Sequence, residues 1–349
     1  MEIGSEFSNV LANTGERKEI TWLPYGQDHA FVFSGRTAIE TIIQDIHCKY
    51  RKVLLPSYCC ESMIEPFMAA GYAIKYYEVT WTDRFMVNLC IPRDCGVLFW
   101  CNYFGFRIDY PLEEIRAFQA RGGIVIEDIT HSLFSQQQYH SNSDYLVASL
   151  RKWGALLSGG FCSKSTGFFA HKPQIEPDQA FLSKKLKAME LKEEYLQEHI
   201  PEKKAQYLRL FTETNQWFED QYSGVLMDEM SGRLIDSWNI EDIRTVRRKN
   251  AAVLYRKLTS CPHIRPLFSM EQMDCPLFVP VCLEQEARNQ LRKALIQEEI
   301  YCPIHWPQPG EVCQSSLYDT ELSLICDQRY SEKDMERICQ VIMRYFGVQ

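Results

Sequence analysis

Hydrophobic positions follow two alternating periods in the first half of the chain. Short apolar runs with the length of strands occur at residues 52–58, 73–79, 96–102 and 123–129. Segments with helical spacing occur at 34–46, 61–71 and 111–123. The last of these ends in the pair Gly122-Gly123, which suits a helix C-terminus. Strands that alternate with helices predict an α/β fold with a mostly parallel central sheet between helices.

The second half of the chain has a different pattern. Residues 173–248 contain charged, amphipathic stretches, and these predict long surface helices interrupted at Pro201. The last hundred residues predict a helix, a strand and two more helices, at 247–258, 276–283, 286–299 and 331–346. We therefore expect a large domain over residues 1–248 and a smaller C-terminal α+β domain over residues 249–349.

Composition narrows the class of protein. Of 349 residues, 46% are hydrophobic and 24% charged, which is typical of a globular protein, and the net charge of −8 disfavours non-specific nucleic-acid binding. No apolar run approaches the roughly 20 residues that span a bilayer, and the first residues lack a signal-peptide pattern. The 14 cysteines are dispersed and form no paired set with metal-ligand spacing. We expect free thiols, no metal and a cytoplasmic location.

An acidic pair ends one predicted strand. Glu127 and Asp128 close the run 123–129, and His131 follows. In parallel α/β sheets, ligands bind at the carboxyl ends of strands, so a carboxylate there can meet a cationic ring nitrogen. The alternative is a turn carboxylate that caps the next segment.

A lysine follows another apolar run. The run that begins after Asp144 ends at Ser149, and Lys152 comes three residues later, before a glycine pair at 159–160. A lysine at such a strand end can lose its charge by desolvation and attack aldehydes. The alternative is an ordinary surface lysine.

A glycine precedes the first predicted helix. Gly35 lies in the sequence SGRTAIE, where backbone N–H groups at a helix N-terminus can bind a phosphate. The alternative is a plain helix cap. The three patterns occur in the order phosphate turn, strand-end acid, then serine and lysine before the glycine pair.

That order resembles fold-type-I pyridoxal-phosphate enzymes and, more narrowly, the DegT/StrS family of sugar aminotransferases. The resemblance extends over most of the chain. Its motifs are EIGSEF, SGRTAIE, LLPSYCC, WCNYFGF, VIEDITHS, SDYLVASLRKW, IYCPIHWP and LICDQRYSEKDMERI. Two features depart from the family pattern: SLRK shortens the serine-to-lysine spacing, and no G-x-N-Y-R-like loop, which supplies contacts from the partner subunit, occurs in 173–248.

The resemblance implies catalytic roles for two residues. Lys152 would hold pyridoxal 5'-phosphate as a Schiff base and carry protons once it is released. Asp128 would keep the pyridine nitrogen protonated so that the ring acts as an electron sink. His131 takes a position that is usually Gln, against the ring or its 3-oxygen.

The resemblance also implies which residues surround the cofactor and the substrate. Ser149 and the turn Gly35, Arg36 and Thr37 would hold the phosphate. Cys60 lies where the family often has an aromatic residue over the ring, and the aromatic here is Tyr58. His305 would close over the substrate, with a structural turn histidine as the alternative.

The implied activity is transfer of an amino group, with L-glutamate as donor, to a keto acceptor such as a nucleotide-linked keto sugar. A homodimer is implied as well. Two other functions remain open: elimination or dehydration with the same cofactor, and a non-catalytic regulatory role. Dehydratases of the family replace the lysine with His, so Lys152 argues against that version. Asp128 and Lys152 together disfavour the regulatory role.

Overall fold

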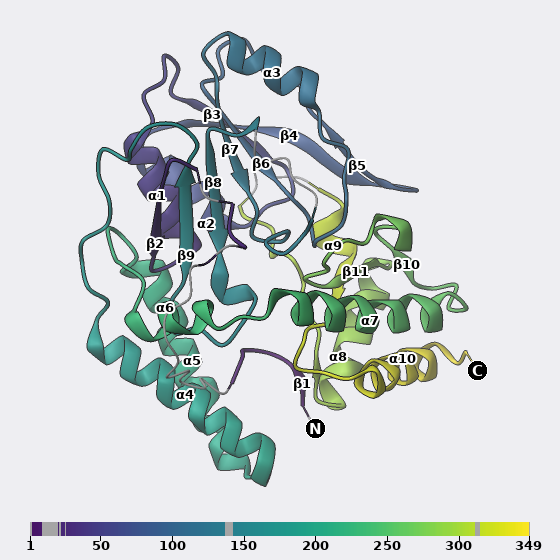
Figure 1. Cartoon of the computed structure of the whole chain (residues 1–349). Coiled ribbons are helices and arrows are strands. Elements are labelled where there is room, and N and C mark those ends of the chain that lie inside the picture. The colour runs from purple at the N-terminus through teal and green to yellow at the C-terminus, as the bar shows by residue number, and fades with distance from the viewer. Residues whose placement is uncertain are drawn as a thin grey trace.

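The chain folds around an eight-stranded sheet (Figure 1). The computed structural model describes residues 2–8, 20, 22–24, 26–136, 142–310 and 315–348. In spatial order the strands are β2 (Asp28–Val32), β9 (Gly160–Lys164), β8 (Tyr145–Ser149), β7 (Ile124–Asp128), β6 (Val97–Cys101), β3 (Lys52–Pro56), β4 (Ala73–Trp81) and β5 (Phe85–Asn88). The five strands from β8 to β4 are parallel, and β9 and β5 run antiparallel to their neighbours.

Helices flank this sheet, so the expected α/β fold is confirmed (Figure 1). Those within the sheet region are α1 (Gly35–Asp45), α2 (Glu61–Ala69) and α3 (Leu112–Ala120). The segment expected to be helical forms α4 (Gln179–Glu198), α5 (Pro201–Asp220), α6 (Glu229–Asp236) and α7 (Ile240–Leu258). Within the described ranges, no helix is both long and apolar enough to cross a membrane.

The C-terminal residues build a smaller α+β unit. Its antiparallel sheet contains β10 (Arg265–Pro266), β11 (Val279–Cys282) and β13 (Glu321–Leu324). The helices nearby are α8 (Gln285–Gln297), α9 (Leu317–Thr320) and α10 (Glu332–Phe346). Near the amino end, β1 (Ile3–Gly4) pairs in parallel with β12 (Ile300–Tyr301). The expected domain division at residues 248 and 249 falls inside α7 and stays a prediction.

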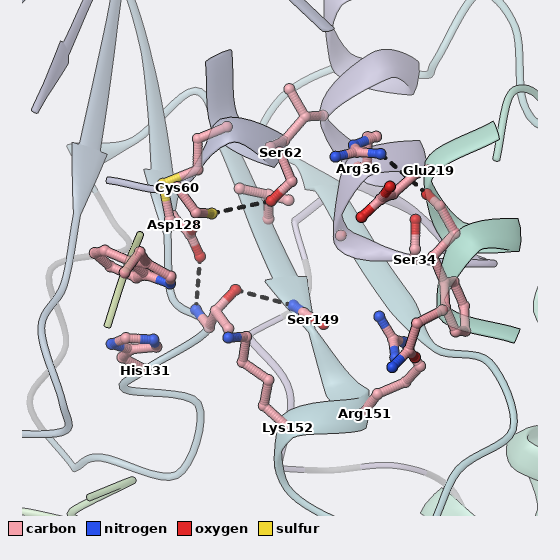
Figure 2. Close-up of a pocket in the computed structure, with 18 residues that line it drawn as sticks. Ser34, Arg36, Cys60, Ser62, Asp128, His131, Ser149, Arg151, Lys152 and Glu219 are labelled. Carbon is pink, nitrogen blue, oxygen red and sulfur yellow. Dashed lines mark hydrogen bonds between the residues drawn. The ribbon is translucent and has the colours of Figure 1, made fainter. Parts of the chain in front are cut away.

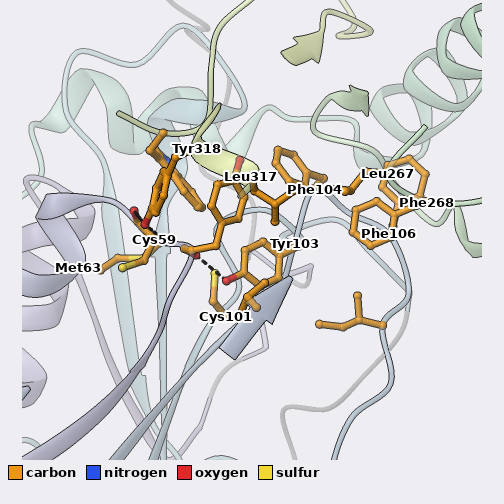
Figure 3. Packing of buried hydrophobic residues seen from close by; sticks show 14 of the residues in the cluster. Cys59, Met63, Cys101, Tyr103, Phe104, Phe106, Leu267, Phe268, Leu317 and Tyr318 are labelled. Atoms are coloured by element: carbon orange, nitrogen blue, oxygen red, sulfur yellow. Dashed lines mark hydrogen bonds between the residues drawn. The ribbon is translucent and has the colours of Figure 1, made fainter. Parts of the chain in front are cut away.

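One continuous hydrophobic core joins the large sheet to the C-terminal unit (Figure 3). Phe106 stacks on Phe268 with ring centroids 4.9 Å apart and an interplanar angle of 8°. The hydroxyl of Tyr318, in α9, accepts a hydrogen bond from the backbone N–H of Cys59 at 2.9 Å. These contacts hold the C-terminal unit over the carboxyl ends of the parallel strands, where ligands bind in such sheets.

A close backbone approach places the start of α1 beside the end of β8. Ser34 caps α1 by accepting a hydrogen bond from the backbone N–H of Thr37 at 3.2 Å. A Cβ on Gly160 would lie 2.1 Å from the Ser34 carbonyl oxygen, and one on Gly35 would lie 3.2 Å from the Ser149 Cβ. The absence of a side chain at Gly160 is therefore a condition for this turn.

Replacement of Gly160 by alanine tests that condition. Because the clash is with backbone, we expect Gly160→Ala to lower the free energy of unfolding in urea by about 1–3 kcal/mol. The matched control is Gly232→Ala inside α6, where an added Cβ meets no atom of the described residues within 4 Å. That variant should gain up to about 1 kcal/mol. Equal stability of the two variants would contradict the account of the turn.

Candidate active site

A cavity of about 390 Å³ opens at the carboxyl ends of β7 and β8, beside the N-terminus of α1 (Figure 2). Its lining includes Lys152, Asp128, His131, Cys60 and Ser149. Five residues that the sequence singled out, from three separate segments, thus share one cavity. They come together because the parallel strands end at the same edge of the sheet.

Lys152 ends a short 3₁₀ turn that follows β8 directly. The next residue, Trp153, is fully buried, and its Nε1–H donates to the Thr130 carbonyl at 2.7 Å. With Trp153 fixed in the core, the Lys152 side chain points into the cavity, toward Asp128 and His131 (Figure 2). Burial lowers the pKa of Lys152, and the positive charge of Arg151 lowers it further. A lysine with a lowered pKa has a larger fraction of nucleophilic amine at neutral pH.

The two strand-end acids have different environments. Glu127 is fully buried and accepts hydrogen bonds from the Asn102 amide at 2.9 Å and the Ser143 hydroxyl at 2.7 Å. Asp128, which points to the opposite face as alternation in a strand requires, lines the cavity. Its Oδ1 accepts a hydrogen bond from the backbone N–H of Thr130 at 2.8 Å. Burial raises the pKa of Asp128, so its ionised form needs a cationic partner.

His131 forms part of an aromatic wall of the cavity. Its ring is stacked on Trp306, with centroids 5.4 Å apart and an interplanar angle of 26°. Nδ1 accepts a hydrogen bond from the backbone N–H of Phe104 at 3.3 Å, so the ring proton is on Nε2. That Nε2 is buried and has no partner among the described residues. Burial, with the charge of Lys152, lowers the pKa of His131 well below its usual value and keeps the ring neutral.

The other end of the cavity is suited to an anion. Gly35 and Arg36 begin α1 and line the cavity together with Ser149. Arg36 forms an ion pair with Glu65 at 2.7 Å, yet its Nε has no hydrogen-bond partner within the described chain. The guanidinium of Arg151 lies 3.6 Å from the Phe218 ring centroid, and burial lowers its pKa to about 10. Free N–H groups at a helix start beside two arginines form an anion site.

Two expected cofactor contacts are absent from the cavity. Tyr58 is fully buried in the core, with its ring centroid 5.0 Å from that of Trp306, and it does not line the cavity. Thr37 does not line it either, because its N–H caps the helix through Ser34 and its hydroxyl donates to the Tyr222 carbonyl at 2.9 Å. Trp306, which stacks on His131, lines the cavity where Tyr58 does not.

Several lining residues were missed in the sequence. They are Ser34, Thr130, Asn215, Phe218, Glu219 and Trp306. Ser34 could have been found, since a serine before a helix is an N-cap signal. The α5 residues give no such signal, because their helix is charged and amphipathic in the same way as a surface helix.

A second cavity of about 520 Å³ adjoins the first. The two share Arg151, Lys152 and Asn215 in their lining. His305 lines the second cavity and faces His131, with ring centroids 5.5 Å apart at 85°. The structure therefore brings His305 to the lysine, as the sequence led us to expect of a substrate residue, although its role stays a prediction.

The residues of the first cavity fit pyridoxal 5'-phosphate. A buried amine, Lys152, suits an aldehyde, and a buried carboxyl, Asp128, suits a protonated pyridine nitrogen. The start of α1 with Ser149, and the unpartnered Nε atoms of Arg36 and Arg151 in the described structure, suit a phosphate. All three features line the same cavity.

Comparisons with known proteins identify the fold. No protein-family model and no curated protein matches the sequence. Among solved structures, PseC of Helicobacter pylori, an aminotransferase in pseudoaminic acid biosynthesis, superposes with a TM-score of 0.66 at 12% identity, covering 93% of this chain and 88% of PseC.

Two other solved structures agree with PseC. DesV of S. venezuelae, in complex with a ketimine intermediate, gives a TM-score of 0.63 at 14% identity, covering 91% of this chain and 84% of its own. DesI in the presence of its TDP-sugar product gives 0.60 at 12%, covering 91% and 81%. The chain thus has the same fold as these proteins over nearly its whole length.

Proposed function

We propose that this protein is a pyridoxal-phosphate-dependent aminotransferase. The observation that carries the proposal is the convergence of Lys152, Asp128 and the start of α1 on one cavity of about 390 Å³. Pyridoxal phosphate, when bound, supplies an electron sink that stabilises negative charge at the substrate carbon. The shared fold with PseC and DesV supports the same assignment.

Each residue of the cavity has a separate role in the proposed reaction. Lys152 would hold the cofactor through its amine, and the same amine would take and return protons at the substrate carbon. Asp128 keeps a proton on the pyridine nitrogen through a charge-assisted hydrogen bond. His131, whose Nε2–H has no partner among the described residues, would donate to an oxygen on the ring. The α1 start and Ser149 hold the phosphate.

We propose that L-glutamate is the amino donor and that the acceptor is a nucleotide-linked keto sugar. The second cavity of about 520 Å³ next to Lys152 offers room for a substrate larger than an amino acid. DesI, which was solved with a TDP-sugar product, supports an acceptor of this class. We also propose a homodimer located in the cytoplasm, as the resemblance to sugar aminotransferases implies.

A half-reaction tests the proposal without knowledge of the acceptor. The purified protein loaded with pyridoxal phosphate should absorb in the near-visible, and addition of L-glutamate should abolish that band. Pyridoxamine phosphate and 2-oxoglutarate should form in equal amounts. If no common amino acid produces pyridoxamine phosphate while the cofactor stays bound to Lys152, aminotransfer is excluded, and release of ammonia would favour elimination.

The variant Asp128→Asn separates an effect on the reaction rate from an effect on stability. We expect Asp128→Asn to slow the glutamate half-reaction by roughly a hundredfold or more, since the pyridine nitrogen loses its ionic partner. The cofactor-free variant should melt no lower than the parent, because Asn keeps an acceptor for the Thr130 N–H and removes a buried carboxyl whose pKa is raised.

The neighbouring acid provides the control for that variant. Glu127→Gln disturbs the acceptors of Asn102 and Ser143 and should lower the melting temperature. Its half-reaction rate per folded site should stay far above that of Asp128→Asn. Similar rates in the two variants would contradict the role of Asp128.

A further inference from the structure

His305 lies where a substrate group would be bound. It is 6% exposed and lines the second cavity together with Lys152. Its backbone N–H donates to Glu321 Oε2 at 2.8 Å, and its ring Nδ1 lies 2.8 Å from the Ser323 hydroxyl. Within the described ranges the other ring nitrogen, Nε2, has no hydrogen-bond partner. The ring is therefore held from one side and open to the cavity on the other.

A chain of hydrogen bonds runs from this ring into the core. Ser323 Oγ lies 2.5 Å from Glu321 Oε1, and both residues are fully buried on β13. They are two positions apart, so their side chains share one face of the strand. A serine hydroxyl has one proton, so Ser323 can donate to Glu321 or to His305 but not to both.

The charge of Glu321 therefore decides which nitrogen of His305 carries the proton. When Glu321 is ionised, Ser323 donates to it and accepts from Nδ1–H, which leaves Nε2 bare. When Glu321 is protonated, Oε2 already accepts the His305 N–H, so the proton is on Oε1. Glu321 Oε1–H then donates to the Ser323 hydroxyl, and the Ser323 hydroxyl donates to Nδ1 of His305. The ring proton is therefore on Nε2, which faces the cavity.

The surroundings bring this change close to neutral pH. Burial raises the pKa of Glu321 to about 8, against the effects of Ser323, the His305 backbone and Arg288 on α8. Tyr58 and Cys282, on β11, also lie close to this carboxyl. His305 faces Lys152, and burial lowers its pKa well below the usual value. The ring is thus neutral in both arrangements, and only the position of its proton changes.

The charges around the second cavity favour an anion. Apart from Lys152, its charged lining residues are Glu6, Arg151, Arg247, Asp327 and Arg329, three arginines against two carboxylates. Arg247 donates to the Pro276 and Leu277 carbonyls and to Gln328. Arg329 donates to Asp327 and to the Ser5 and Glu6 carbonyls. The positive charges of these two arginines attract an anion, while His305 and Arg151, whose Nε has no partner among the described residues, are left to donate hydrogen bonds to it.

We propose that Glu321 and Ser323 set the ring tautomer of His305, and that His305 in its Nε2–H form donates a hydrogen bond to a carboxylate oxygen of the amino donor and its 2-oxo-acid product. Glu321 and Ser323 are then positioning residues, and His305 contacts the substrate. The second half of this inference rests on the proposed function, and the first half does not.

The tautomer is measured without substrate, by ¹⁵N NMR of the protein labelled at its eight histidines. His305, assigned by loss of its signal in His305→Gln, should be Nε2–H at pH 6.5 and Nδ1–H at pH 9.5. In Glu321→Gln the amide must donate to Ser323, so Nε2–H should persist at both values. The matched control, Glu332→Gln on the exposed first turn of α10, should behave as the parent. If all three proteins showed the same tautomer at both pH values, the proposed control of the His305 tautomer by Glu321 would be wrong.

Binding of 2-oxoglutarate tests the contact, because this ligand does not titrate between pH 6.5 and 9.5. Calorimetry should give a Kd that rises roughly tenfold in the parent over this range, as a charged acceptor loses its donor. In Glu321→Gln the rise should be largely absent. If the tautomer changed but the Kd did not depend on pH, the contact between His305 and the substrate carboxylate would be excluded, while the control of the tautomer by Glu321 would stand. A protein that binds 2-oxoglutarate as described but gives no half-reaction would overturn the proposed function alone.

Discussion

The position of Asp128 relative to Lys152 depends on the hydrogen bonds of Thr130. Its backbone N–H holds Asp128 Oδ1, its hydroxyl accepts the backbone N–H of Ser149 at 2.9 Å, and its carbonyl accepts the Trp153 indole N–H. A buried threonine thus joins the segment after β7 to the end of β8 and the turn that follows it through two hydrogen bonds, and a third holds the Asp128 carboxylate. The parallel pairing of β7 with β8 brings the two strand ends together, and the Thr130 bonds fix the residues that follow them.

Burial of these groups away from water then shifts their pKa values. The same burial raises the pKa of Asp128 and lowers that of Lys152, which moves both groups toward neutral pH. Nearby, burial opposes ionisation of Glu6, yet Lys185 and Arg151 lower its pKa to about 2. Where water is largely excluded, the attraction between opposite charges is stronger, so cationic groups in this cavity would bind a phosphate or carboxylate tightly. The site is therefore matched to anionic ligands at both of its ends.

The sequence predicted what depends on local pattern. The runs at 52–58, 96–102 and 123–129 became β3, β6 and β7, because parallel strands buried on both faces are continuously apolar. The run at 73–79 became β4, in which exposed positions alternate with more buried ones. The residues Lys152, Asp128 and His131 were found at strand ends, where ligand-binding residues gather. What could not be predicted depends on contacts between distant segments.

Such contacts decide the details of the site. Tyr58 fits the aromatic position by sequence, but the C-terminal unit packs Trp306 and Tyr318 against it and encloses it in the core. Asn215 and Glu219 reach the cavity only because α5 lies across it, and a charged helix gives no indication of its neighbours. The chain Glu321–Ser323–His305 also joins residues that are 16 and 18 positions apart, through hydrogen bonds between side chains of β13 and the segment after β12.

Covalent trapping tests the central claim most directly, namely that Lys152 carries the cofactor. The protein loaded with pyridoxal phosphate would be reduced with borohydride, digested and mapped by mass spectrometry, with Lys152→Ala treated in parallel. We predict one phosphopyridoxyl group per chain, on Lys152, and none in the variant. A modification on another lysine, such as the buried Lys185, with Lys152 unmodified, would contradict the account.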